Sequence, residues 1–164
     1  MKTLKFVQLI ALLFLVMVTG VFWGPWLGLH RTLSVFSQAE LIHIVQVLAQ
    51  NLAGPMQVIM SASVLLLTIA AWLYPDKKQK EFYFNIISIL LVIASVLISV
   101  LIELPIVDEM KTWTLATIPP HWEAMRDRWV FYHVIRLLIA FAGLTCFGIT
   151  MLQPFRKTNK NPSI

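Results

Sequence analysis

Four long apolar runs constrain this chain more than any other feature of its sequence. They cover residues 6–29, 53–74, 82–104 and 129–152. Each run approaches or exceeds the roughly 20 residues that a helix needs to cross the hydrocarbon core of a bilayer. A helix satisfies its backbone polar groups internally, whereas an open strand in lipid leaves them unpaired. The sequence therefore predicts an all-α integral membrane protein, a bundle of four transmembrane helices.

Composition agrees with a lipid environment. Hydrophobic residues make up 59% of the 164 residues and charged residues only 13%, against about 25% charged in soluble domains. The net charge of +5 comes from short loops and tails rather than a basic face, which argues against nucleic-acid binding. The lone cysteine, Cys146, excludes an intrachain disulfide and CxxC redox chemistry. We expect one transmembrane domain over residues 1–155 and a disordered cytoplasmic tail over residues 156–164.

The distribution of Lys and Arg predicts the orientation. Basic residues gather in three segments: Lys2 and Lys5, then Lys77, Lys78 and Lys80, then Arg156, Lys157 and Lys160. Two spans separate each segment from the next, so all three lie on the same side of the membrane. Cytoplasmic segments carry such an excess of Lys and Arg. Both termini are therefore expected on the cytoplasmic side of a plasma membrane, that of a bacterium. The first run imitates a signal peptide, but no A-x-A site follows it and it continues past Gly20, which predicts an uncleaved helix.

Two further patterns concern packing. Residues 37–50 carry apolar side chains at helical spacing, which predicts an extra amphipathic helix in the first outer loop that leads into the second span, either as a separate element or continuous with it until Gly54 and Pro55. This segment adds His43 as a candidate ligand-binding residue, although a hydrogen-bonded packing role is the alternative. In the first span, Gly20, Gly24 and Gly28 recur every four residues, a spacing typical of close helix contact. Pro25 is expected to kink this helix and free a carbonyl near Val21.

The fourth span carries a stripe of polar and aromatic residues. Its members are spaced by 4, 3, 4 and 3 residues and so share one helix face: Trp122, Arg126, Trp129, His133 and Arg136. An arginine inside the membrane is costly unless it is paired or reaches water, so His133 and Arg136 are candidate catalytic residues. Trp122, Arg126 and Trp129 are candidate ligand-binding residues. The alternative is that Arg136 extends to the outer interface, where Trp129 anchors the helix.

The third span offers a partner for these groups. Small and polar residues share one of its faces: Asn85, Ser88, Ser95, Ser99 and Glu103. Glu103, at the outer end, is the first candidate to pair with Arg136 or His133 and completes the candidate catalytic set. A carboxylate in headgroup water is the alternative.

Histidine spacing gives no metal or haem signature. None of His30, His43, His121 and His133 forms an H-x-x-x-H or H-E-x-x-H pair. A non-haem iron site would need two histidines and a carboxylate, which His43, His133 and Glu103 supply only if folding brings them together. The cofactor, if there is one, stays unknown.

A series of short motifs follows the third span. The matching positions are Pro105, Trp113, Pro119, Trp122, Arg126, Trp129, His133 and Arg136. They resemble the P-x-x-W, R-x-x-W and H-x-x-R motifs of the anthrone-oxygenase-like family of membrane proteins, also catalogued as domain of unknown function 1772. Members often carry Asn where this chain has Val107 followed by Asp108, so no role is carried over for that Asn. The resemblance covers most of the chain and implies a four-helix membrane fold; some fungal members are linked to anthrone oxidation.

Three functions are consistent with these features. The first is an oxidoreductase for a lipophilic aromatic or quinone-like substrate, in which tryptophans stack on the ring, Arg136 stabilises a phenolate or enolate and His133 moves the proton. The second is a non-catalytic membrane module whose polar cluster locks the bundle or docks a partner or a lipid. The third, a small transporter, lacks the paired broken helices expected of one. Membrane lipids and a lipophilic small molecule are the expected partners, and a homo-oligomer is left open.

Overall fold

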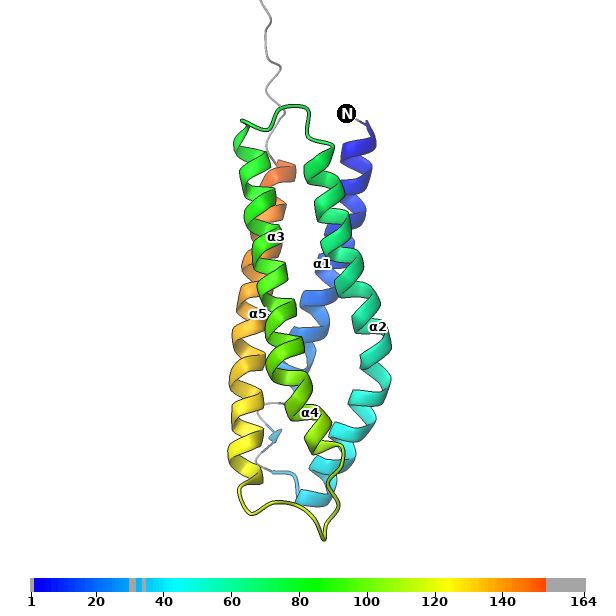
Figure 1. Cartoon of the computed structure of the whole chain (residues 1–164), viewed down its shortest axis with the longest axis vertical. Helices are drawn as coiled ribbons and strands as arrows, with labels where there is room; N and C mark the ends of the chain where they lie inside the picture. Colours follow the sequence, from blue (N-terminus) through cyan, green and yellow to red (C-terminus); the bar gives the residue numbers. More distant parts are fainter. Residues whose placement is uncertain (1, 30–31, 34, 153–164) are drawn as a thin grey trace, which may run out of the picture.

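The computed structural model describes residues 2–29, 32–33 and 35–152, and within them the chain forms helices and no strand. The elements, in order, are α1 (Lys2–Gly28), α2 (Gln38–Trp72), α3 (Lys80–Ile98), η2 (Ser99–Glu103), α4 (Leu104–Met110) and α5 (Trp122–Leu152) (Figure 1). The predicted disordered tail, His30 and Arg31 lie outside the described residues.

Within the part of the chain that the structure describes, four helices are long and apolar enough to span a membrane, as the sequence predicted. They are α1, α2, the continuous helix Lys80–Met110 formed by α3, η2 and α4, and α5, with mean hydropathies between 1.8 and 2.8. The start of α1, the α2–α3 loop and the end of α5 lie at one end of the bundle (Figure 1). This end carries Lys2, Lys5, Lys77 and Lys78 and is called the basic end below, and the opposite end is called the far end. That the basic end faces the cytoplasm remains a prediction.

The predicted amphipathic helix is the first part of α2 rather than a separate element. Ser37 caps α2 in a capping box, in which its hydroxyl accepts from the Glu40 N–H and the Glu40 carboxylate accepts from the Ser37 N–H. The helix then continues through Pro55 to Trp72. Its apolar face is buried through Leu41, Ile42 and Val45, because these residues meet α4 and the following loop. Gln46 Nε2 fixes that contact by donating to the carbonyls of Lys111 and Trp113 at 3.1 and 3.3 Å.

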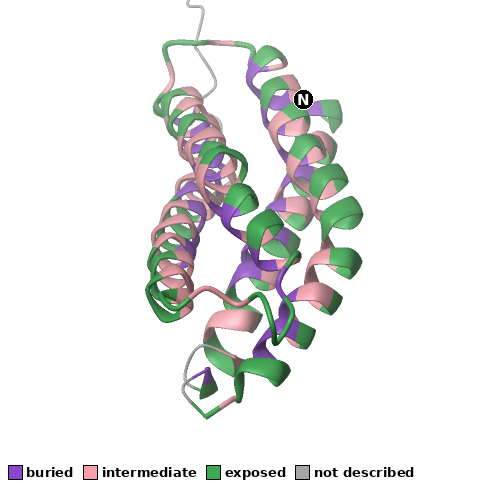
Figure 2. Ribbon diagram, turned by 60° about the horizontal axis from the view of Figure 1, so that its bottom comes forward, coloured by how far each residue is buried: buried purple, intermediate pink, exposed green. Residues whose placement is uncertain are grey.

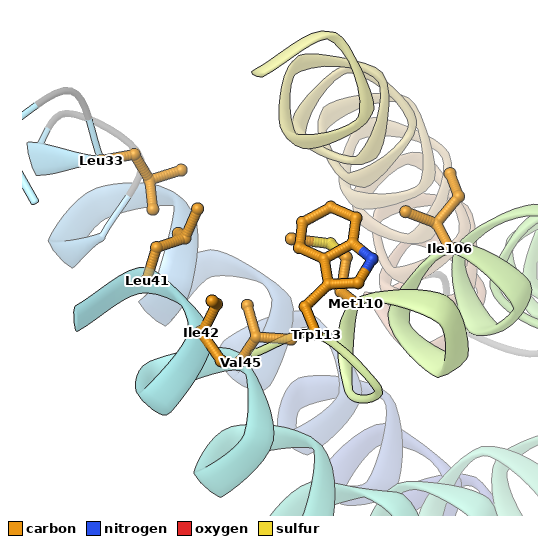
Figure 3. Close-up of a cluster of buried hydrophobic side chains, with 7 residues drawn as sticks. All are labelled: Leu33, Leu41, Ile42, Val45, Ile106, Met110 and Trp113. Carbon is orange, nitrogen blue, oxygen red and sulfur yellow. The ribbon is translucent and has the colours of Figure 1, made fainter. Parts of the chain in front are cut away.

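Buried residues face the interior along the whole bundle (Figure 2). Near the basic end they include Ala11, Leu15, Leu67, Val92 and Phe147. In the middle they are Val18, Phe22, Leu137 and Ala140. At the far end, a cluster that we call the far-end cap joins α2, α4 and the segments beside them (Figure 3): Leu33, Leu41, Ile42, Val45, Ile106, Met110 and Trp113.

The tightest glycine contact joins α3 and α5, and it is not the contact that the sequence suggested. A Cβ added at Gly143 would lie 3.3 Å from Val92 Cγ2, and Ser88 Oγ donates to the Gly143 carbonyl at 2.8 Å. By contrast, Gly20, Gly24 and Gly28 are exposed, and a Cβ added at any of them meets nothing within 4 Å. The prediction that this ridge packs closely against another helix is therefore wrong. A small-residue spacing permits close approach, but here the ridge lies exposed on the surface of the bundle.

A single π-helical turn, Ser99–Glu103, interrupts the third transmembrane helix. The Leu104 N–H donates to the Ser99 carbonyl five residues back. Pro105 follows, and it has no N–H to continue an α-helical ladder to Leu101. The wider turn accommodates this loss, and the helix resumes as α4. Such π turns are frequent at functional sites, and this one supplies two of the residues described next.

Candidate functional site

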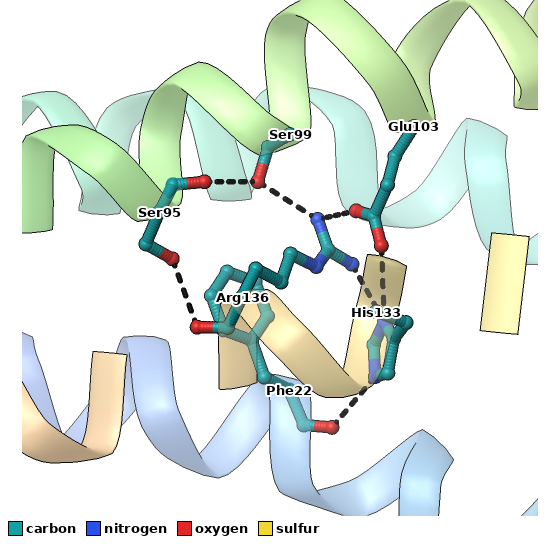
Figure 4. Close-up of polar contacts among 6 residues, drawn as sticks. All are labelled: Phe22, Ser95, Ser99, Glu103, His133 and Arg136. Carbon is teal, nitrogen blue, oxygen red and sulfur yellow. Dashed lines mark hydrogen bonds and ion pairs between the residues drawn. The ribbon is translucent and has the colours of Figure 1, made fainter. Parts of the chain in front are cut away.

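Three ionisable side chains meet inside the bundle toward the far end: Glu103, His133 and Arg136 (Figure 4). The Glu103 and His133 side chains are only 3% and 7% exposed, and that of Arg136 is 15% exposed. Arg136 Nη1 forms an ion pair with Glu103 Oε2. The alternatives in which either residue extends to the membrane interface therefore do not describe this structure. In a low-dielectric interior each charge depends on the other for its burial.

The Arg136 guanidinium is held from three helices. Besides Glu103, its Nη1 donates to Ser99 Oγ at 2.9 Å, and its Nη2 lies 2.8 Å from His133 Nδ1. Its Cζ sits 4.2 Å from the centre of the Phe22 ring on α1, a cation–π contact. The side chain is thus fixed from α1, from the π turn and from its own helix.

The hydrogen bonds assign the tautomer of His133. Its Nε2 lies 2.9 Å from the Phe22 carbonyl oxygen, which only accepts, so Nε2 carries the proton. Nδ1 then accepts from Arg136 Nη2. Glu103 Oε1 is 3.6 Å from the same Nδ1, beyond hydrogen-bond distance. In this state the imidazole is neutral, and the charges of Glu103 and Arg136 cancel.

The carbonyl that accepts the hydrogen bond from His133 belongs to a turn of α1 that precedes Pro25. A proline inside a helix lacks the N–H that would bond the carbonyl four residues earlier, here that of Val21. The sequence predicted a freed carbonyl in this turn, and the structure uses the neighbouring one, from Phe22. Phe22 itself was not among the predicted site residues. A phenylalanine in an apolar run does not by itself indicate a functional site. Pro25 was the sequence feature that pointed to this turn.

Two serines of the predicted polar face connect α3 to the site. Ser95 Oγ donates to the Arg136 carbonyl at 3.2 Å, and Ser99 Oγ donates to the Ser95 carbonyl at 2.9 Å. The one proton of Ser99 is therefore used within the helix, and its oxygen is left to accept from Arg136. Glu103 Oε1 and Arg136 Nε have no hydrogen-bond partner among the described residues. Both atoms are also buried.

Of the predicted ligand-binding residues, Trp129 lies beside these three side chains, and Trp122, Arg126 and His43 do not. The ring of Trp129 lies 5.6 Å from that of His133. Trp122 and Arg126 instead contact each other, with the guanidinium 5.2 Å from the indole, and Arg126 also pairs with Asp127. They share a helix face with His133 but lie nearer the start of α5, at the far end. His43 is exposed on α2.

The iron site considered from the sequence is not assembled. Among the described residues, no group of three His, Cys, Asp or Glu side chains is placed to hold a metal ion. His133 and Glu103 meet, whereas His43 does not join them. A small hollow of about 10 Å³ adjoins His133, lined by Pro25, Trp26, Leu29, Leu33, Trp129 and Val130. This is room for about one water molecule.

The model of the family described as anthrone oxygenase matches residues 47–146, a span that includes Glu103, His133 and Arg136. No curated protein and no solved structure matches the chain significantly.

Proposed function

The chain belongs to the anthrone oxygenase family, and we propose that it is a membrane oxidoreductase that oxidises a lipophilic, anthrone-like substrate at Glu103, His133 and Arg136. An anthrone carries a methylene group between two aromatic rings, opposite a ketone. Removing a methylene proton places negative charge on the ketone oxygen. A base beside a fixed cation is the arrangement that promotes such a step.

The observation that carries this proposal is the hydrogen bond between Arg136 Nη2 and His133 Nδ1, with Glu103 behind it. A substrate oxygen that accepts from Arg136 Nη2 would release the Nδ1 lone pair. His133 could then take the methylene proton on Nδ1. The new N–H would face Glu103 Oε1, now 3.6 Å away and without a hydrogen-bond partner among the described residues. Arg136 thus binds the developing oxyanion, His133 accepts the proton and Glu103 stabilises the imidazolium.

O2 is the oxidant in the overall reaction. The methylene carbon loses two hydrogens and gains a carbonyl oxygen, while O2 supplies that oxygen and the oxygen of one water. The residues described here account for binding, proton removal and stabilisation of the anion. The bundle also keeps bulk water from the anion, because the far-end cap covers this end of the interior (Figure 3).

A non-catalytic role is favoured by a different observation. The three side chains largely satisfy one another, and the hollow beside His133 is too small for an aromatic ring. In that case the cluster fixes α1, α3 and α5 together and has no turnover. The two functions differ in what His133 contributes, which an experiment can separate.

The test uses the full chain in lipid nanodiscs with anthrone and air-saturated buffer. Oxygen uptake and anthraquinone absorbance should exceed the rate of protein-free nanodiscs. His133→Ala should remove the excess rate while keeping the thermal midpoint. A matched control is Thr145→Ala, an exposed α5 hydroxyl bonded to its own helix, which should behave like the wild type. No excess oxidation, together with a lowered midpoint for His133→Ala, would support the non-catalytic role instead.

A further inference from the structure

A larger hollow opens on the lipid-facing side of the bundle between α2 and α3. This groove has a volume of about 460 Å³ and is lined by Met60, Ser61, Val64, Leu65, Thr68, Ile93, Val96 and Leu97. Sites that bury small organic ligands measure roughly 300–1,000 Å³. The lining is mostly aliphatic, and the Thr68 hydroxyl already donates to the Val64 carbonyl. Such a surface suits an uncharged, lipophilic molecule that is dissolved in the bilayer.

The groove lies within about one helical turn of the candidate site in depth, on the other side of α3. Its α3 residues, Ile93, Val96 and Leu97, belong to the turns that flank Ser95. Ser95 donates to the backbone of Arg136 on α5. A molecule in the groove is therefore level with the Arg136 backbone, and the guanidinium, which binds Ser99, lies about one turn nearer the far end.

On the α2 side, Met60 stands between the groove and the interior. It lines the groove and also packs against the buried cluster that contains Phe22. The Phe22 ring in turn covers the Arg136 guanidinium, and its carbonyl holds His133. Methionine is unbranched and flexible, and it adapts its shape more readily than other apolar residues. Displacing Met60 would open a path from the groove toward Phe22.

The far end offers a poorer entrance for a ring system. There the far-end cap buries Trp113 and Met110, which are 4% and 2% exposed. The hollow that does reach His133 holds about one water. A lipophilic substrate is also more concentrated in the bilayer than in water, since its transfer into an apolar medium is favourable.

We propose that the groove between α2 and α3 is the binding site through which the lipophilic aromatic substrate enters from the bilayer, with Met60 as the side chain that moves to admit it. The identity of the substrate rests on the proposed function. The location of the binding site rests on the groove, its depth and Met60.

Photolabelling locates the binding site without any turnover. The probe is 2-azidoanthraquinone, a ring system of the product type, irradiated with the full chain in nanodiscs and mapped by mass spectrometry. The label should appear on the groove residues of α2 and α3 and should be lost with excess anthraquinone. Ser61→Phe, which fills the groove, should reduce labelling about tenfold, an effect expected when a pocket loses room for a few carbon atoms. The control Val58→Phe changes an exposed α2 residue outside the groove and should label normally.

Label spread over lipid-facing residues, or label that excess anthraquinone does not remove, would overturn the proposal. So would equal labelling of the Ser61→Phe and Val58→Phe proteins. Groove labelling in a protein that does not oxidise anthrone would leave the binding site standing and remove the proposed function. Oxidation of anthrone by a protein that is labelled outside the groove would support the proposed function and remove the binding site.

Kinetics test the role of Met60 in an active protein. Met60→Phe, which is stiffer, should raise KM for anthrone by about tenfold with kcat maintained. Met60→Leu keeps a similar volume, so its fold should survive and its KM should change less. A loss of kcat at unchanged KM in Met60→Phe would contradict a role in entry.

Discussion

The guanidinium of Arg136 on α5 and the carboxylate of Glu103 in the π turn form an ion pair inside the bundle, where the surrounding side chains are largely apolar. Ser99, one turn earlier on the same helix, accepts a second hydrogen bond from the same guanidinium nitrogen. The pair thus ties the third transmembrane helix to the fourth at the depth of the candidate site.

Removing one charge of this pair should lower the free energy of unfolding more than removing both charges. Arg136→Leu leaves Glu103 as an isolated buried carboxylate, a change that typically costs about 3–5 kcal/mol. The double variant with Glu103→Gln should recover part of that loss. Unfolding in detergent would be followed by circular dichroism, with Arg128→Leu, an exposed α5 position, as the control. Additive effects of the two changes would contradict the coupling.

The tautomer of His133 is open to direct observation. Spectra of ¹⁵N-histidine-labelled protein should contain one imidazole with a protonated Nε2 and a bare Nδ1, because the Phe22 carbonyl and Arg136 fix those roles. The signal is assigned by its disappearance in His133→Gln. A proton on Nδ1 of this residue would show that the network differs from the one described.

Two glycine substitutions should give opposite results. Gly143→Leu forces a side chain against Val92 and Leu91, and overpacking of this kind costs about 1–3 kcal/mol. Gly24→Leu adds its side chain on an exposed position with open space and should leave the thermal midpoint nearly unchanged. Equal destabilisation by both would indicate that the ridge on α1 is covered in the native membrane.

The orientation of the bundle can be checked by labelling intact cells. In a Cys146→Ala background, a membrane-impermeant maleimide should modify Thr117→Cys, in the loop at the far end. It should spare Lys78→Cys at the basic end until the membrane is permeabilised. This follows from the excess of Lys at the basic end. The opposite pattern would place the termini outside.

The sequence predicted the spans and the central residues of the candidate site because both follow from the cost of burial. Apolar runs of this length have few alternatives to membrane helices. His133 and Arg136 lie within such a run, so a partner such as Glu103 was required. The segment over residues 37–50 leads into the second span as one helix, because Gly54 and Pro55 do not end α2 in this structure.

Other parts of the site could not be read from side-chain patterns. The Phe22 carbonyl is a backbone acceptor, and the π turn shifts the register of α4 without a distinctive residue other than Pro105. Helical periodicity also grouped residues that lie far apart, because it identifies the face of a helix that a residue occupies and not its position along the axis. Trp122 shares a face with His133 but lies 11 residues earlier, about 16 Å along the axis.

The ion pair also bears on how the protein is made. Glu103 lies in the third span, and Arg136 lies in the fourth, which leaves the ribosome after it. Arg136 can shed its hydration only beside a helix that already carries the opposite charge, so α5 requires α3 as its docking partner when it enters the bilayer. Loss of Glu103 would then appear in a cell as failed insertion of α5 and clearance by quality-control proteases. Cellular abundance, measured before any assay of activity, would reveal this dependence.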